Sequence, residues 1–238
     1  FCKMWKEIIF LILTVLLSLT IATMSSWRTW NDQIIGVKLH DMLFELLPDL
    51  SDRFAPTFPH YLLLLQMILG LVSLFSSKKL YMYIAQFIFL QSLLTAIRAI
   101  AVVITTLPMI HVYEHCEKEI TSFLQAFEYM VIYGTCGDYM FSGHTAMSFL
   151  TYMFVNEHYP YYAWKLISGL LLGSQMLFLI LLRWHYSVDI LIACIITWLL
   201  FRLYKRYEGS DFWFYFKSFD NSTGRKNRFT EPSVLSKI

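Results

Sequence analysis

Three side chains in the sequence have the types and the spacing that phosphoryl transfer requires. His185 and Asp189 are four residues apart, so on a helix they lie on one face, one turn apart. A carboxylate in that position accepts a hydrogen bond from one imidazole nitrogen and leaves the other nitrogen as a nucleophile or base. His144 follows Ser142 and Gly143, a small pair at an expected helix start, where an anion is favoured. The alternative is a pair of structural histidines at helix ends, with Asp189 facing a polar loop.

The composition places these side chains in a membrane protein. The chain has 238 residues, of which 57% are hydrophobic and 18% aromatic, whereas only 15% are charged. A soluble domain averages about 25% charged residues and needs more polar surface than this chain supplies. The same figures exclude a disordered, a collagen-like and a disulfide-rich secreted chain. The net charge of +2, without a basic block interleaved with aromatic residues, argues against a nucleic-acid-binding protein.

Apolar runs predict six membrane-spanning helices, because a span needs about 20 mostly apolar residues. The expected spans cover residues 8–27, 61–77, 80–110, 139–155, 163–182 and 184–204. The expected fold class is therefore all-α, a polytopic six-transmembrane-helix bundle formed by residues 1–208. Residues 209–238 are expected to form a cytosolic tail that is partly disordered.

The basic residues predict which side of the membrane each loop faces. Most of the 19 Lys and Arg residues lie at the amino end, in the loops before the third and fifth spans, and from Arg202 onward. Positive charge is retained in the cytosol, so both termini are expected to be cytosolic. His144 and His185 open the fourth and sixth spans, which enter the membrane from the opposite face. We therefore expect the two histidines at the same face and at similar depth, where they can share a site.

Two segments that contain these residues resemble the signature motifs of the sphingomyelin synthase family, a branch of the lipid phosphate phosphatase superfamily. Residues 136–145 read C-G-D-Y-M-F-S-G-H-T, and residues 185–193 read H-Y-S-V-D-I-L-I-A. Two weaker matches occur at Leu47-Pro48-Asp49 and at Arg98 with the following I-T-T-L-P of residues 104–108. The resemblance thus runs from about Pro48 to Ala193, with the motifs in the family's order.

The resemblance implies a two-step phosphotransferase at the lumenal or exoplasmic face, with a phosphatidylcholine:ceramide cholinephosphotransferase-like activity. His185, oriented by Asp189, would attack the phosphorus of a glycerophospholipid and form a phosphohistidine. His144 would protonate the departing diacylglycerol and later deprotonate the primary hydroxyl of ceramide. The implied partners are the two lipid substrates and the bilayer, with a homo-oligomer as a further expectation. No cofactor and no metal are implied.

Arg98, Asp138 and Ser142 are candidates for binding the substrates. Arg98 lies within an apolar run, where it can hold the phosphate or pair with Asp138 or Asp189; the alternative is a snorkelling or purely structural residue. Asp138 can instead orient Tyr139 or cap the following helix. Ser142 belongs to the first motif and lies two residues before its histidine.

Arg183 and Trp184 also count as substrate-binding candidates, and here the chain departs from the family pattern. Animal members usually carry an acidic residue just before the histidine of the second motif, whereas plant and protozoan relatives that transfer phosphoinositol commonly carry basic residues. Arg183 can hold the phosphodiester or an anionic head group, and Trp184 can form one wall of a choline pocket. The alternative is that both only anchor a helix end at the membrane interface. The donor stays open between choline, ethanolamine and inositol phospholipids, with choline favoured.

Two other functions compete with the transferase. A lipid phosphate phosphatase would use water as acceptor, but the sequence has no K-x₆-R-P motif, and Leu179 occupies the position six residues before His185 where an Arg is expected. A non-catalytic ceramide-binding membrane protein would not need His144, His185 and Asp189 together. The transferase therefore remains the leading hypothesis.

The remaining expectations concern the cysteines, zinc and the compartment. Cys116 and Cys136 fall in the same extracytoplasmic loop, so a disulfide between them is a hypothesis. The H-V-Y-E-H of residues 111–115 has the spacing of an inverted zinc-protease motif, but no third distant ligand is evident. The Golgi or the plasma membrane is the expected location, with the endoplasmic reticulum as the alternative.

Overall fold

The computed structural model describes residues 2–31, 39–55, 57–75, 80–105, 107, 122, 124–125, 127–128 and 140–207. Within these residues the regular secondary structure is entirely α-helical, which confirms the predicted all-α class. The helices with described bounds are α1 (Cys2–Asn31), α2 (Met42–Leu46), α3 (Phe58–Phe75), α4 (Leu80–Ile104), α6 (Gly143–His158), α7 (Tyr162–Leu181) and α8 (Ser187–Tyr207). The chain divides into two compact units, residues 1–201 and residues 202–238.

Four of the described helices are long and apolar enough to cross a membrane. They are α3, α7 and the segments Met82–Ile104 of α4 and Ser187–Arg206 of α8. Helix α1 contains a shorter apolar stretch, Ile8–Met24, and α6 has 16 residues. Many large apolar side chains on α1, α3, α7 and α8 are exposed, as expected for helices that face lipid. The chain is a multi-pass membrane protein.

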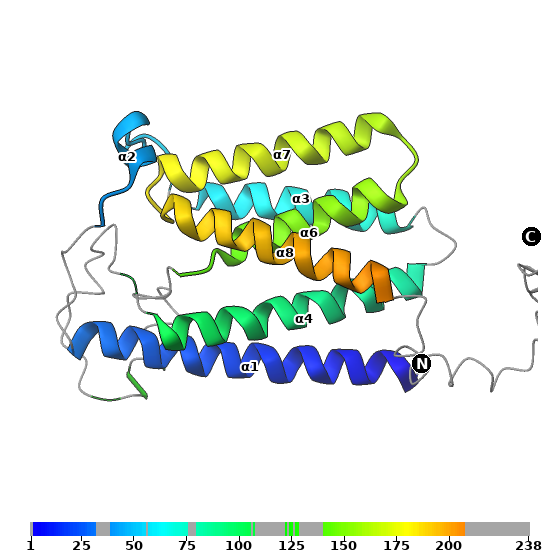
Figure 1. The fold of residues 1–238 in the computed structure, drawn as a ribbon, viewed down its shortest axis with the longest axis horizontal. Helices are drawn as coiled ribbons and strands as arrows, with labels where there is room; N and C mark the ends of the chain where they lie inside the picture. Colours follow the sequence, from blue (N-terminus) through cyan, green and yellow to red (C-terminus); the bar gives the residue numbers. More distant parts are fainter. Residues whose placement is uncertain are drawn as a thin grey trace, which may run out of the picture. The chain divides into compact units, whose positions relative to one another are not determined.

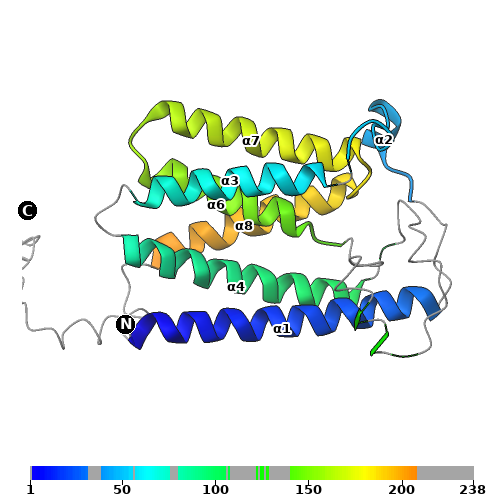
Figure 2. The same ribbon diagram turned by 180° about the vertical axis from the view of Figure 1, so that it is seen from behind.

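The long helices lie side by side with their axes nearly aligned (Figures 1 and 2). Helix α1 packs along α4, while α3, α6 and α7 pack against one another, and α4 joins the two groups through its contact with α6. Helix α8 contacts α6 through the rings of Phe154 and Phe201, and it contacts α7 through Ile190. Helices α3, α6 and α8 all begin at the same end of the bundle (Figure 1).

Buried polar pairs hold the centre of the bundle together. The amide of Gln66 on α3 donates to the hydroxyl of Ser168 on α7 at 2.7 Å. The hydroxyl of Ser148 on α6 donates to the amide oxygen of Gln175 on α7. Because lipid offers no hydrogen-bonding partners, such pairs and small side chains are the usual contacts between membrane helices. They fix the positions of α3 and α6 relative to α7.

The segment before α3 docks on the turn between α7 and α8 through Arg183. This residue has φ = 56°, a left-handed conformation that is strained for most side chains other than glycine. Its Nη2 donates to the carbonyl oxygens of Phe44 and Leu47 at 2.7 and 2.9 Å, and its Nε lies 3.6 Å from the carboxylate of Asp49. The guanidinium also covers the Phe44 ring, 4.3 Å from its centroid. These contacts offset the backbone strain.

Asp41 connects the same segment to the start of α8. Its Oδ1 accepts a hydrogen bond from the backbone of Leu43 at 2.9 Å, and its Oδ2 accepts one from the backbone of Ser187 at 2.7 Å. One carboxylate therefore caps both α2 and α8. Helix α8 begins at Ser187, so the sixth helix starts later than the sequence predicts, and His185 lies in the preceding turn instead of in the helix.

Replacing Arg183 separates the strain of its backbone from the contacts of its side chain. Arg183→Ala is expected to lower the free energy of unfolding by about 3 kcal/mol, because charge-assisted hydrogen bonds to two carbonyl groups are lost while the strain stays. Arg183→Gly should cost about 1 kcal/mol less, since glycine adopts a positive φ without strain. Thermal unfolding of both variants in the same detergent measures the difference. An alanine variant as stable as the glycine variant would contradict this account of the turn.

Candidate functional site

Three histidines gather at the end of the bundle where α3, α6 and α8 begin. His144 lies in the first turn of α6, His60 in the first turn of α3, and His185 in the turn before α8. The ring centroids of His144 and His185 are 6.5 Å apart, and those of His60 and His144 are 4.9 Å apart. The predicted proximity of His144 and His185 is therefore confirmed. Sequence reasoning missed His60.

His60 contacts His144 directly. Its Nδ1 lies 2.9 Å from Nε2 of His144, a hydrogen bond in which one ring donates and the other accepts. Trp184 packs edge-on against both rings, with centroids 5.0 Å from His60 and 5.6 Å from His144. Successive helices run in alternating directions, which predicts a common membrane face for His144 and His185. The same argument applies to His60, because His60 lies at the start of α3, which runs in the same direction as α6 and α8. That signal was present in the sequence.

Asp189 holds the turn that carries His185. Its Oδ2 accepts a hydrogen bond from the backbone of Tyr186 at 3.1 Å and lies 3.6 Å from Nδ1 of His185. The carboxylate is completely buried, and His185 is only 6% exposed. The pair thus meets as the spacing predicts, although His185 is outside the helix. The contact lies on Nδ1, so Nε2 is the ring nitrogen on the far side from Asp189.

Arg98 lies against the start of α6. A Cβ added to Gly143 would lie 2.7 Å from Nη1 and 3.2 Å from Cζ of Arg98, so a larger residue at Gly143 would displace the guanidinium. The close approach of this flexible side chain favours glycine here, and φ at this position is not positive. A guanidinium beside the amino end of a helix creates a positive environment that favours an anion such as a phosphodiester.

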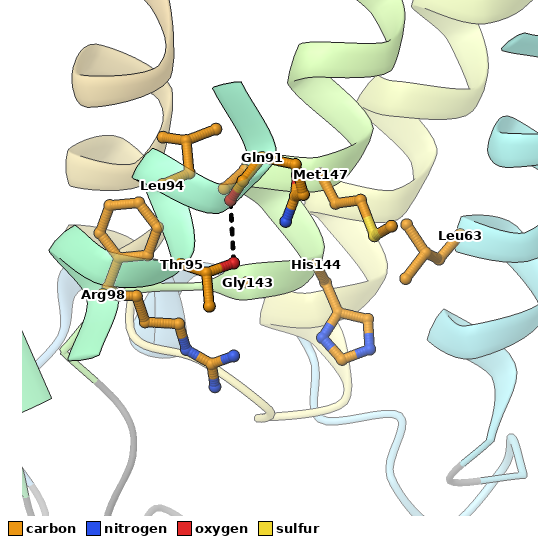
Figure 3. A pocket seen from close by; sticks show the side chains of 10 residues that line it. Leu63, Gln91, Leu94, Thr95, Arg98, Gly143, His144 and Met147 are labelled. Atoms are coloured by element: carbon orange, nitrogen blue, oxygen red, sulfur yellow. Dashed lines mark hydrogen bonds between the residues drawn. The ribbon is translucent and has the colours of Figure 1, made fainter. Parts of the chain in front are cut away.

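A cavity of ≈ 240 Å³ connects Arg98 with His144. Figure 3 shows the guanidinium of Arg98 and the ring of His144 at one end of this cavity, with Gln91 and Thr95 farther along α4. The apolar part of its wall comes from α3, α4, α6 and the residue before Ser142, namely Leu63, Leu94, Phe141, Ala146 and Met147. A phosphate near Arg98 could therefore have an apolar chain beside it.

The other predicted site residues have different surroundings. Ser142 is fully buried and caps α6, since its Oγ accepts a hydrogen bond from the backbone of Thr145 at 3.3 Å. Arg183 has the contacts to the segment before α3 that are described above, which support the turn carrying His185. Asp138, Cys116 and Cys136 lie outside the described residues, as does the H-V-Y-E-H segment. Within the described ranges, no three His, Cys, Asp or Glu side chains are arranged to hold a metal ion.

Comparison with known proteins finds two kinds of similarity that include this end of the chain. Residues 135–206 match the family described as PAP2 superfamily C-terminal. Phosphatidylcholine:ceramide cholinephosphotransferase 2 from Rattus norvegicus is 30% identical over 127 residues, which cover 47% of this chain and 35% of the relative. Phosphatidylcholine:ceramide cholinephosphotransferase 1 from Homo sapiens is 32% identical over 124 residues, which cover 45% of this chain and 30% of the relative. The match thus spans about a third of the length of these relatives.

Proposed function

We propose that this chain, a sphingomyelin synthase-like member of the lipid phosphate phosphatase superfamily, transfers a phospho-head group from a glycerophospholipid to the primary hydroxyl of ceramide. One observation carries the proposal most directly. The rings of His144 and His185 lie 6.5 Å apart, and the buried Asp189 carboxylate lies 3.6 Å from Nδ1 of His185. A nucleophile, its orienting carboxylate and an acid–base group are thereby available to one phosphorus atom.

In the first step, His185 is the nucleophile. Its Nε2 attacks phosphorus, a new N–P bond forms, and the bond from phosphorus to the diacylglycerol oxygen breaks. His144 donates a proton to that oxygen as it leaves, so diacylglycerol departs as a neutral alcohol. Arg98 stabilises the negative charge on the non-bridging oxygens from its position at the start of α6.

In the second step, ceramide is the acceptor. His144 takes the proton of the primary hydroxyl while that oxygen attacks phosphorus, and the N–P bond to His185 breaks. Both histidines return to their starting protonation states, so the cycle consumes no external proton. Exchange of one phosphodiester for another is close to isoenergetic and therefore needs no nucleotide. The low water content of a site within the bilayer limits hydrolysis of the intermediate.

The same proposal includes the membrane arrangement. Six spans, formed by the four long apolar helices together with α1 and α6, would place both termini in the cytosol. The site would then face the lumen or the cell exterior, in the Golgi or at the plasma membrane. A disulfide between Cys116 and Cys136 would be compatible with that face.

Phosphocholine is the head group that we propose. The names of the two relatives specify phosphatidylcholine as the donor and ceramide as the acceptor. In this chain, Trp184 lies beside His144, where an aromatic face can contact a quaternary ammonium group. Ethanolamine and inositol phospholipids are the alternative donors.

The experiment that tests this function uses purified protein in liposomes with fluorescent ceramide. Separate samples contain phosphatidylcholine, phosphatidylethanolamine or phosphatidylinositol, and a His185→Asn variant provides the blank. We expect a fluorescent phosphocholine product that requires phosphatidylcholine. A product from another donor alone would correct the head group. Release of diacylglycerol without any ceramide product would contradict the transferase and favour hydrolysis of the donor's phosphodiester, with water as the acceptor.

A further inference from the structure

Three polar residues form a stripe along the face of α4 that lines the cavity. Gln91, Thr95 and Arg98 are spaced by four and three residues, so they lie on one face of the helix. All three line the cavity together with His144. Because a helix rises about 1.5 Å per residue, Gln91 lies roughly 10 Å along α4 from Arg98. The stripe therefore runs from the reacting centre into the apolar part of the bundle.

Gln91 has hydrogen-bonding capacity that its protein surroundings leave unused. Its Oε1 is buried and has no hydrogen-bond partner among the described residues. Thr95 does not supply one, since its hydroxyl donates to the backbone carbonyl of Gln91 at 2.9 Å. A buried polar atom without a partner is unfavourable. Other buried side-chain atoms in the described part of the chain share this state, and Gln91 is singled out because it also lines the cavity. Figure 3 shows Gln91 among the side chains that line the cavity.

In a lipid whose phosphate lies near Arg98, the next portion along the molecule is the backbone that joins the head group to the chains. In a glycerolipid, that backbone carries two esters, which only accept hydrogen bonds. In ceramide, it carries an amide N–H and a secondary hydroxyl, which both donate. The amide NH₂ of Gln91 can donate a hydrogen bond to either lipid. Its amide oxygen, by contrast, can accept a hydrogen bond only from a lipid whose backbone has donor groups.

We propose that Gln91 recognises the backbone donors of the sphingoid acceptor and so selects ceramide over diacylglycerol as the acceptor. The inference rests on the proposed function and specifies how its site chooses between two lipids that both have a primary hydroxyl. Diacylglycerol is released at this site, and its return to the phosphohistidine would only reverse the first step. A site that hydrogen-bonds a donor group discriminates strongly against a competitor lacking that group. Gln91 therefore favours net transfer.

The test compares two acceptors in the same liposomes. Labelled ceramide and labelled diacylglycerol are supplied with unlabelled phosphatidylcholine, and kcat/KM is measured for each as it receives the head group. Gln91→Met keeps the length of the side chain and removes its polar atoms. We expect a loss of roughly fivefold or more in kcat/KM for ceramide, as for one hydrogen bond, with diacylglycerol unchanged. Leu94→Met, on the same wall of the cavity, is the matched control and should leave the ratio unchanged.

The possible outcomes distinguish failure of the role proposed for Gln91 from failure of the proposed transferase function. An unchanged ratio in Gln91→Met, an equal loss for both acceptors, or the same shift in Leu94→Met would overturn the role of Gln91 while the transferase stands. Transfer by the wild-type protein to diacylglycerol alone, or to neither acceptor, would overturn the proposed function and the role of Gln91 with it.

Discussion

The His185→Asn variant is expected to form the ceramide product at least roughly a thousandfold more slowly than the wild-type protein, because the reaction then has no nucleophile. Asparagine can retain a polar contact to Asp189 but has no second nitrogen that can attack phosphorus. The bond from the backbone of Tyr186 to Asp189 does not involve the imidazole, so the turn should keep its conformation. The loss is therefore chemical and not structural.

The covalent intermediate gives this prediction a direct readout. With a donor labelled at phosphorus and no ceramide, the wild-type protein should retain label in an acid-labile, base-stable form that is typical of a phosphoramidate. His185→Asn should retain none. Adding unlabelled ceramide to the labelled wild-type protein should discharge the label into lipid product. Label that persists in His185→Asn would assign the nucleophile to another residue.

His40 offers a matched control for the substitution itself. It lies in the segment before α2, its side chain is 81% exposed, and its Nε2 is 2.7 Å from a carboxylate oxygen of Glu45. An exposed pair of this kind contributes little to stability. His40→Asn should therefore retain wild-type activity and wild-type labelling. A similar loss in both variants would mean that the assay responds to folding and not to chemistry.

The sequence predicts the helices and the meeting of His144 with His185, because both follow from local patterns. Apolar runs locate the ends of the long helices to within six residues, and the alternation of helix directions brings the starts of α6 and α8 to one end. The start of α8 could not be predicted in the same way. It is set by the carboxylate of Asp41, which is 146 residues away in the chain and caps Ser187.

The roles of Ser142 and Arg183 show a second limit of sequence reasoning. Both lie beside a motif histidine, which made them candidates for substrate binding. In the folded chain, Ser142 caps α6, and Arg183 stabilises its own left-handed backbone through contacts with the segment before α3. A motif position can therefore be needed to hold a histidine in place, and only tertiary contacts reveal that.

His60 is the residue whose replacement should have the second largest effect. We expect His60→Phe to lower kcat by roughly a hundredfold, within the range for loss of acid–base function, while KM for the donor changes little. The aromatic ring preserves the packing against Trp184, but it has no nitrogen to bind Nε2 of His144. Without that partner, His144 is free to rotate and to adopt either tautomer, so fewer molecules present its proton to the leaving oxygen.

His60→Asn distinguishes this positioning role from a structural one. An asparagine amide can replace the imidazole as a hydrogen-bond partner of His144, so kcat should recover to within roughly tenfold of wild type. The same variant loses the aromatic contact with Trp184, so its thermal stability should fall below that of His60→Phe. Activity and stability would thus rank the two variants in opposite orders. If the more stable variant were also the more active one, His60 would support the fold of the α3 start and would have no part in holding His144.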